Sequence, residues 1–151
     1  MDGGAIEKNK EVIRRFVEEV QGKHHLDLVE DLMDPNMVDH YFEMQGLPPS
    51  DLNATDGFKK FFSGMLVVFP DLNVVHYNMI AEGDMVATHK TFRATHKGEF
   101  MGVPPTGKQV EVEVIDIFRI AGGKMVEHWG LVNWMSVLKQ LGVGAPTKPQ
   151  A

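Results

Sequence analysis

Asp116 is the residue whose surroundings in the sequence point most directly to chemistry. Reading residues 110–120 as a β-strand places alternate side chains on opposite faces of a sheet. One face then carries a single carboxylate among apolar neighbours: Val110, Val112, Val114, Asp116, Phe118 and Ile120. Burying even a neutral polar group without a partner costs on the order of 2–7 kcal/mol. Asp116 is therefore expected to be either a paired structural group or part of a functional site.

His128 is the predicted partner of Asp116. Residues 121–123 (AGG) separate the first strand from a second one at residues 124–132. A three-residue turn, closed by a glycine in the left-handed region, would pair Ile120 with the first residue after the turn and place Asp116 opposite His128. Directly opposed side chains have Cβ atoms about 4.5–5.5 Å apart, which suits a carboxylate–imidazole pair. We favour this turn over a two-residue glycine turn, which would rotate His128 to the other face.

The favoured register also assigns the remaining side chains of the second strand. Val126, His128 and Gly130 are predicted to point inward, and Glu127 and Trp129 outward.

An aspartate beside a histidine can perform general acid/base chemistry. Removing a proton from a carbon next to a carbonyl needs a base with a pKa near neutral. Burial raises the pKa of a carboxylate, and a neighbouring imidazolium lowers it. Histidine is the more natural proton shuttle, with Asp116 orienting it. The alternative is a buried ion pair that only specifies the strand register, and the residues leave both interpretations open.

Other polar residues are candidates for ligand contacts. Asp39 and His40 follow a predicted helix end, where His40 could bind a carbonyl oxygen or the pair could simply cap the helix. His96 ends a predicted strand at residues 85–96 whose two faces are both mixed, so the sequence does not say which face is buried. The seven histidines show no spacing typical of a metal site, and we expect no metal.

The composition favours one globular domain that acts on a small molecule. A chain of 151 residues can bury a single core, and a net charge of −6 argues against nucleic acid or an anionic membrane as a partner. There are no cysteines, so disulfides and thiol catalysis are excluded. No apolar run approaches the roughly 20 residues that span a bilayer. Without a secretory pattern at the N-terminus, a cytoplasmic protein is expected.

Helical patterns come first and strand patterns follow, as in α+β folds. Apolar spacing predicts helices at residues 6–20, 25–33 and about 53–69, and a closing helix or turn at residues 134–141. Strands are predicted at residues 72–81, 85–96, 110–120 and 124–132. The expected architecture is a cone-shaped, curved antiparallel sheet packed against three N-terminal helices, with a small-molecule cavity between the layers. Residues 1–142 would form this domain and residues 143–151 a disordered tail.

Three segments together resemble the SnoaL-like polyketide cyclase / ester cyclase family, within the nuclear transport factor 2-like (cystatin-like) superfamily. They are residues 98–108 (GEFMGVPPTGK), 115–120 (IDIFRI) and 126–130 (VEHWG). The resemblance extends over about residues 7–142. It implies the α+β cone and an intramolecular aldol condensation, without metal or cofactor, in an open and mostly apolar pocket.

The resemblance also implies a departure at the expected catalytic position. The family's general acid/base is an aspartate, which aligns with Gly130. A family pocket histidine aligns with Asp116 and a family asparagine with Asp39, so the aldol activity does not follow from the motif alone.

Two functions are therefore compatible with the sequence. The first is a cofactor-independent cyclase, lyase or isomerase that uses Asp116 and His128 on a carbonyl-containing apolar small molecule. The second is a non-catalytic module that binds a hydrophobic ligand in the same cavity, near Phe118 and Gly130.

Apolar residues on the opposite face of the sheet predict a homodimer. Ile115, Ile117 and Trp129 would point outward, and no predicted helix is left to cover them. A second subunit packed on this outer sheet face is the simplest explanation.

Overall fold

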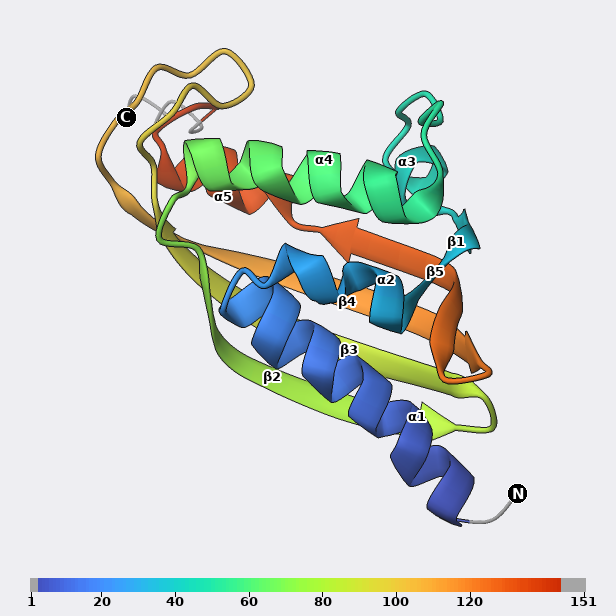
Figure 1. Ribbon diagram of the computed structural model, residues 1–151. Coiled ribbons are helices and arrows are strands. Elements are labelled where there is room, and N and C mark those ends of the chain that lie inside the picture. The colour runs from blue at the N-terminus through green and yellow to red at the C-terminus, as the bar shows by residue number, and fades with distance from the viewer. Residues whose placement is uncertain (1–2, 145–151) are drawn as a thin grey trace.

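A single curved sheet of five strands forms the body of the protein (Figure 1). The structure is a computed structural model, and it describes residues 3–144. The strands lie in the order β1-β5-β4-β3-β2. Their bounds are β1 Met33–Asp39, β2 Asn73–Glu82, β3 Met85–Thr95, β4 Gln109–Ala121 and β5 Lys124–Val132. The predicted α+β architecture is thus confirmed, while most of the predicted tail at residues 143–151 falls outside the described residues.

The edge strand β1 departs from the prediction of a purely antiparallel sheet. Residues 37–44 were expected to form a short extended or irregular segment; residues 37–39 of it belong to β1, which pairs with β5 in parallel, with Asp39 opposite His128. The other neighbouring strands pair antiparallel, as predicted. This parallel edge brings an early segment of the chain beside the last strand.

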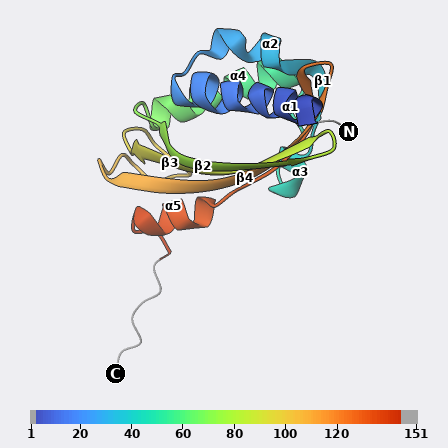
Figure 2. The same cartoon turned by 90° about the horizontal axis from the view of Figure 1, so that it is seen from below.

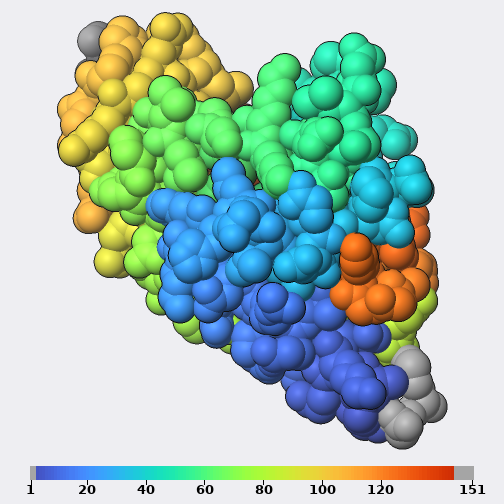
Figure 3. Space-filling view, in the orientation of Figure 1, coloured from blue at the N-terminus to red at the C-terminus, as the bar shows by residue number. Residues whose placement is uncertain are grey.

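Helices cover the concave face of the sheet (Figure 2). In the space-filling view, side chains of the N-terminal helices and α4 close over this side of the molecule (Figure 3). The helix α4 begins after Asn53, whose side chain accepts a hydrogen bond from the Asp56 backbone N–H at 2.8 Å. The helical segments of this layer are α1 Gly3–Arg15, its π-helical continuation η1 Phe16–Gly22, η2 Leu26–Leu28, α2 Val29–Leu32 and α4 Ala54–Val68.

The core lies between this helical layer and the inner face of the sheet. The inner face of β4 is the predicted stripe, and all of its members are buried, including Asp116. On β3, the structure decides between the two mixed faces: the buried side chains are Val86, Thr88, Lys90, Phe92 and Ala94, and His96, directly after the strand, is also buried. Lys90 thus lies within the core. The sequence had not determined whether its face of the strand is buried.

The turn between β4 and β5 differs from the prediction. It is a two-residue turn at Gly122-Gly123, flanked by the pair Ala121 and Lys124. Both glycines have positive φ, +60° and +78°, as hairpin turns of this length require. The predicted three-residue turn, with Ile120 opposite Lys124, is therefore wrong.

A β-bulge returns His128 to the inner face of the sheet. The two-residue turn alone would have placed it on the outer face. Ile120 pairs with Met125 but Arg119 pairs with Glu127, so Val126 is an extra residue on β5. Met125, rather than Val126, is consequently the buried side chain near the turn. Beyond the bulge the alternation is as predicted, and His128 and Gly130 face inward.

The outer face of the sheet keeps exposed apolar side chains, as predicted: Ile115 and Leu131 are 56% and 53% exposed. The short helix α5, Trp134–Gln140, lies beside β4, where the Gln140 side chain forms hydrogen bonds with the Glu111 backbone. Its buried side chains belong to the inner core and do not cover the outer face. Within the described residues, no helix is long and apolar enough to cross a membrane.

Candidate active site

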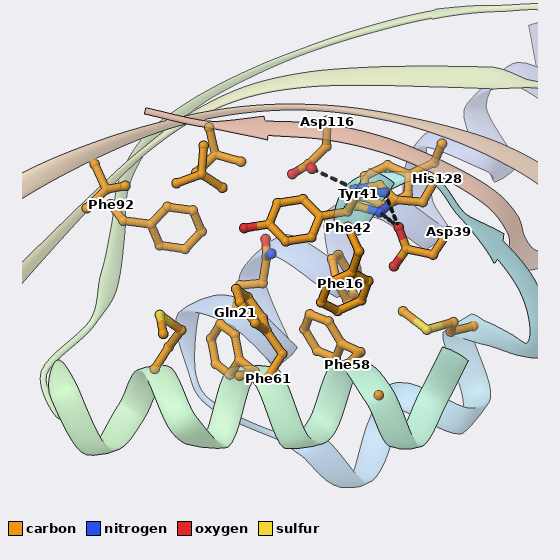
Figure 4. A pocket seen from close by; sticks show the side chains of 18 of the residues that line it. Phe16, Gln21, Asp39, Tyr41, Phe42, Phe58, Phe61, Phe92, Asp116 and His128 are labelled. Atoms are coloured by element: carbon orange, nitrogen blue, oxygen red, sulfur yellow. Dashed lines mark hydrogen bonds and ion pairs between the residues drawn. The ribbon is translucent and has the colours of Figure 1, made fainter. Parts of the chain in front are cut away.

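An apolar cavity of about 120 Å³ lies between α4 and the inner face of the sheet. Aromatic rings from several elements form most of its wall, as Figure 4 shows for Phe16, Phe58, Phe61 and Phe92. The polar exceptions are few and converge: Gln21, Asp39, Tyr41, Asp116 and His128. A cavity of this kind, apolar with a few placed polar groups, is typical of small-molecule sites.

A wider groove of about 550 Å³ adjoins the cavity. The loop at residues 47–53 forms one of its walls, and Met37, Asp39, Phe42, Gly57 and Phe58 line both spaces. An apolar cavity of about 150 Å³ is known to hold a benzene molecule. The inner cavity therefore suits about one ring of a ligand, with the groove left for the remainder.

Four charged groups meet at the end of the cavity, and we call them the ion row: Lys90, Asp116, His128 and Asp39. The Lys90 Nζ lies 2.7 Å from Asp116 Oδ2. The other oxygen, Asp116 Oδ1, is 2.7 Å from His128 Nε2. On the opposite side of the ring, His128 Nδ1 is 2.9 Å from Asp39 Oδ1 (Figure 4). With His128 protonated, the row contains two cations and two anions in alternation.

The predicted convergence of Asp116 and His128 is thus present, but with a different pairing. Asp116 lies directly opposite Gly130, and His128 opposite Phe118. The two side chains meet diagonally, and the imidazole stacks on the Phe118 ring with centroids 4.8 Å apart. Neighbours of this diagonal kind are within reach of long side chains.

Lys90 is the functional residue that the sequence analysis missed. Its side chain is fully buried, and its Nζ also donates to Gln21 Oε1 at 3.0 Å. Its ammonium lies 5.8 Å from the centre of the Phe118 ring. The available signal was its spacing on β3, where it alternates with Thr88 and Phe92. A lysine within an apolar stripe needs a buried anion as its partner, and Asp116 in turn needs a buried cation.

The ion row shifts the pKa of both central groups. Burial would raise the pKa of Asp116, but the charge of Lys90 and the hydrogen bond from His128 outweigh it and lower that pKa to about 2. Burial would likewise lower the pKa of His128, but its hydrogen bonds to Asp116 and Asp39 raise that pKa to about 9. At neutral pH the site therefore holds an imidazolium between two carboxylates.

The titration of His128 tests this charge arrangement. We expect the ring resonances of His128 in the free protein to titrate near pH 9 instead of near 6.5, as followed by NMR. Since the folded-state pKa is the higher one, the stability that the pair contributes is complete below about pH 6.5 and is lost as the pH rises through 9. A midpoint at or below 6.5 would contradict the ion row.

Gly130 leaves the space that the central hydrogen bond occupies. A Cβ atom at this position would collide with Asp116 Oδ1 and would lie only 2.9 Å from His128 Nε2. These atoms are the two partners of the Asp116–His128 hydrogen bond. Any side chain at position 130 is therefore incompatible with this contact as it stands.

Replacement of Gly130 by alanine should separate Asp116 from His128. We expect Gly130→Ala to lower the pKa of His128 by at least one unit and to destabilise the fold by about 1–3 kcal/mol, a typical cost of overpacking. NMR titration and urea unfolding measure the two effects. Gly64→Ala is the matched control, because its Cβ would meet nothing within 4 Å; an unchanged His128 titration in Gly130→Ala would refute the interpretation.

The remaining candidates divide between the cavity and other places. Asp39 and Phe118 line the cavity, and Gly130 adjoins it. His40 does not line it: its ring stacks on Trp129, with centroids 5.0 Å apart, and its Nε2 lies 2.8 Å from Glu127 Oε2.

His96 was also expected to contact a ligand, and it does not line the cavity either. Its ring is fully buried, and its Nδ1 lies 2.9 Å from Thr106 Oγ1, in the loop before β4. The imidazole thus holds that loop against the end of β3. Both rings contact protein groups in this arrangement, and a role of His40 or His96 in ligand binding stays a prediction.

Comparison with known proteins places this fold and site in a family. The family described as SnoaL-like polyketide cyclase matches residues 11–141. Aklanonic acid methyl ester cyclase DnrD of Streptomyces peucetius is 26% identical over 141 residues, which cover 91% of this chain and 92% of that protein. Aklanonic acid methyl ester cyclase DauD of Streptomyces sp. strain C5 is 25% identical, covering 91% and 83%. The crystal structure of IdmH from Streptomyces antibioticus is similar with a TM-score of 0.77 and 30% identity, covering 89% of this chain and 99% of IdmH.

Proposed function

The chain belongs to the SnoaL-like polyketide cyclase family, and on this premise we propose that it closes a ring within a polyketide or a polyketide ester. The observation that carries the proposal is the contact of Asp116 with His128 at the wall of an otherwise apolar cavity. The relatives DnrD and DauD are cyclases of aklanonic acid methyl ester, so polyketide esters are the substrate class to test first.

The reaction that fits this site is an intramolecular aldol addition. A carbon next to a carbonyl loses a proton, its electron pair forms a carbon–carbon bond to a second carbonyl, and the oxygen of that carbonyl takes up a proton. Atoms and electrons balance without an oxidant or a reductant, and the product is an isomer of the substrate. No cofactor is required by this balance.

His128 supplies the positive charge that such a reaction needs. Negative charge develops on carbonyl oxygens as the proton leaves and as the ring closes. A fixed imidazolium in a water-poor cavity stabilises that charge strongly, because the surrounding dielectric is low. Asp116, held ionised by Lys90, orients the imidazolium from the sheet side.

Removal of either central group should abolish turnover. We expect Asp116→Asn and His128→Ala each to lower kcat/KM for aklanonic acid methyl ester or a related ester by at least about 100-fold. Chromatography with mass spectrometry detects a new isomer of unchanged mass, and circular dichroism checks the fold. The control is His25→Ala, because His25 is half-exposed and contacts Glu19 outside the cavity. Full activity in both site variants would refute the proposed mechanism.

A non-catalytic role in ligand binding is the second candidate. It is favoured by one observation: position 130, where the family resemblance implies a catalytic aspartate, is a glycine without room for a side chain. A measurable dissociation constant for polyketide esters together with no isomeric product would support this role instead.

We also propose that the outer face of the sheet joins two copies of the chain. Aligned pairs across β2, β3, β4 and β5 place apolar side chains in neighbouring rows on this face. Ile80, Ile117 and Trp129 belong to one row, and Ile115 and Leu131 to the next. Several of these side chains are well exposed, with Ile80 at 72%, and an apolar patch of this kind is typical of an interface.

Charges on this face should separate the two copies. We expect the double variant Ile115→Lys/Leu131→Lys to be monomeric in analytical ultracentrifugation at concentrations where the unmodified protein is a dimer. Val67→Lys is the control, because Val67 is 73% exposed but lies on α4 in the helical layer. A monomeric unmodified protein, or an unaffected dimer in the double variant, would contradict the proposed interface.

A further inference from the structure

Within the ion row, three groups lack a free atom with which to accept a proton from a substrate. Asp116 is 5% exposed, and its two oxygens are taken by Lys90 and His128. His128 uses both ring nitrogens, one toward each carboxylate. Lys90 is a cation with a fully buried side chain. A base for carbon deprotonation must therefore be sought elsewhere in the row.

Asp39 is the member of the row with an unengaged oxygen. Its Oδ1 accepts from His128 Nδ1 and from the Tyr41 backbone N–H, both at 2.9 Å. Among residues 3–144, no donor contacts its Oδ2, and the side chain is 28% exposed. In Figure 4 the carboxylate lies below the imidazole, on the side of the cavity.

Asp39 lies at the junction of the inner cavity and the wider groove, where it can reach a carbon of a ligand that occupies both. It lines both the inner cavity and the wider groove. A ligand with one ring in the cavity and its remainder in the groove passes this carboxylate at the junction. The sheet end of the row, with Lys90 and Asp116, lies further from the groove.

From this geometry we infer that Asp39 is the catalytic base, with Oδ2 accepting the proton from the carbon next to the substrate carbonyl. The inference rests on the proposed cyclase function and names the group that begins the reaction. The carbon–hydrogen bond breaks, its proton goes to Asp39 Oδ2, and the electron pair forms the new carbon–carbon bond. The second carbonyl becomes an alkoxide, which takes the proton back from Asp39 Oδ2.

The amide variant Asp39→Asn tests this role with little change of structure. Asparagine keeps an oxygen that can accept from His128 and from the Tyr41 backbone, but it replaces the free oxygen by an NH₂ group without a lone pair. We expect kcat to fall at least about 100-fold, in the range of general base catalysis, with KM changed less than about threefold.

Asp34→Asn is a matched control on the same strand. Asp34 Oδ1 also accepts a backbone N–H two residues further on, that of Asn36 at 2.7 Å. The substitution thus removes the same charge and keeps the same local hydrogen bond, away from the cavity. We expect its kcat and KM to equal those of the unmodified protein.

Hydrogen exchange isolates the proton-transfer step from ring closure. A simple β-keto ester that lacks a further carbonyl placed for ring closure cannot cyclise, but its acidic carbon can exchange with D₂O, which NMR follows. We expect the unmodified protein and Asp34→Asn to accelerate this exchange, and Asp39→Asn to lose the acceleration. Exchange and turnover that persist in Asp39→Asn would overturn the inference. Absence of turnover with every ester in the unmodified protein would instead overturn the proposed function, so the two failures are distinguishable.

Discussion

The interaction on which the rest of this structure depends is the ion pair between Lys90 and Asp116 inside the core. Each charge alone would be costly to remove from water, and each is held only because the other lies 2.7 Å away. Together they fix a carboxylate at the inner face of the sheet. That carboxylate in turn holds a protonated His128, whose other nitrogen reaches Asp39. Lys90 thus keeps Asp116 ionised, and Asp116 together with Asp39 keeps His128 protonated.

The backbone has two features that make this arrangement fit. The extra residue Val126 on β5 turns His128 toward the interior after a tight glycine turn. The glycine at position 130 leaves the volume that the hydrogen bond between Asp116 and His128 fills. Both features are local, and either one, if changed, moves the imidazole while the surrounding helices stay in place. The site is therefore more sensitive to backbone detail than the fold is.

Much of the architecture could be predicted from periodicity alone. The stripe on β4 follows from the alternation of apolar residues, and the long helices follow from apolar residues three to four positions apart; both patterns depend only on neighbours along the chain. The convergence of Asp116 and His128 was predicted through an incorrect turn. A turn shortened by one residue and a bulge of one residue together shift the register by two positions, which keeps His128 on the predicted face but moves it diagonal to Asp116. Neither length can be read from the two glycines alone.

The rest of the site required the tertiary arrangement. Lys90 was not identified because its strand has two mixed faces, and only pairing with β4 shows which is buried. His40 and His96 were expected to meet a ligand, but proximity in sequence to polar neighbours does not determine the direction of a ring. His40 instead stacks on Trp129, and His96 holds the loop at Thr106.

The parallel pairing of β1 with β5 has a consequence for how the protein matures. Asp39 and His128 are 89 positions apart in the chain, and no nearer segment can replace either of them. Contacts between distant segments form late, because closing a long loop costs entropy before any contact repays it. During synthesis, a nascent chain that ends before β5 contains Asp39 but not yet its partner His128. The ion row should therefore be complete only once β1 has paired with β5.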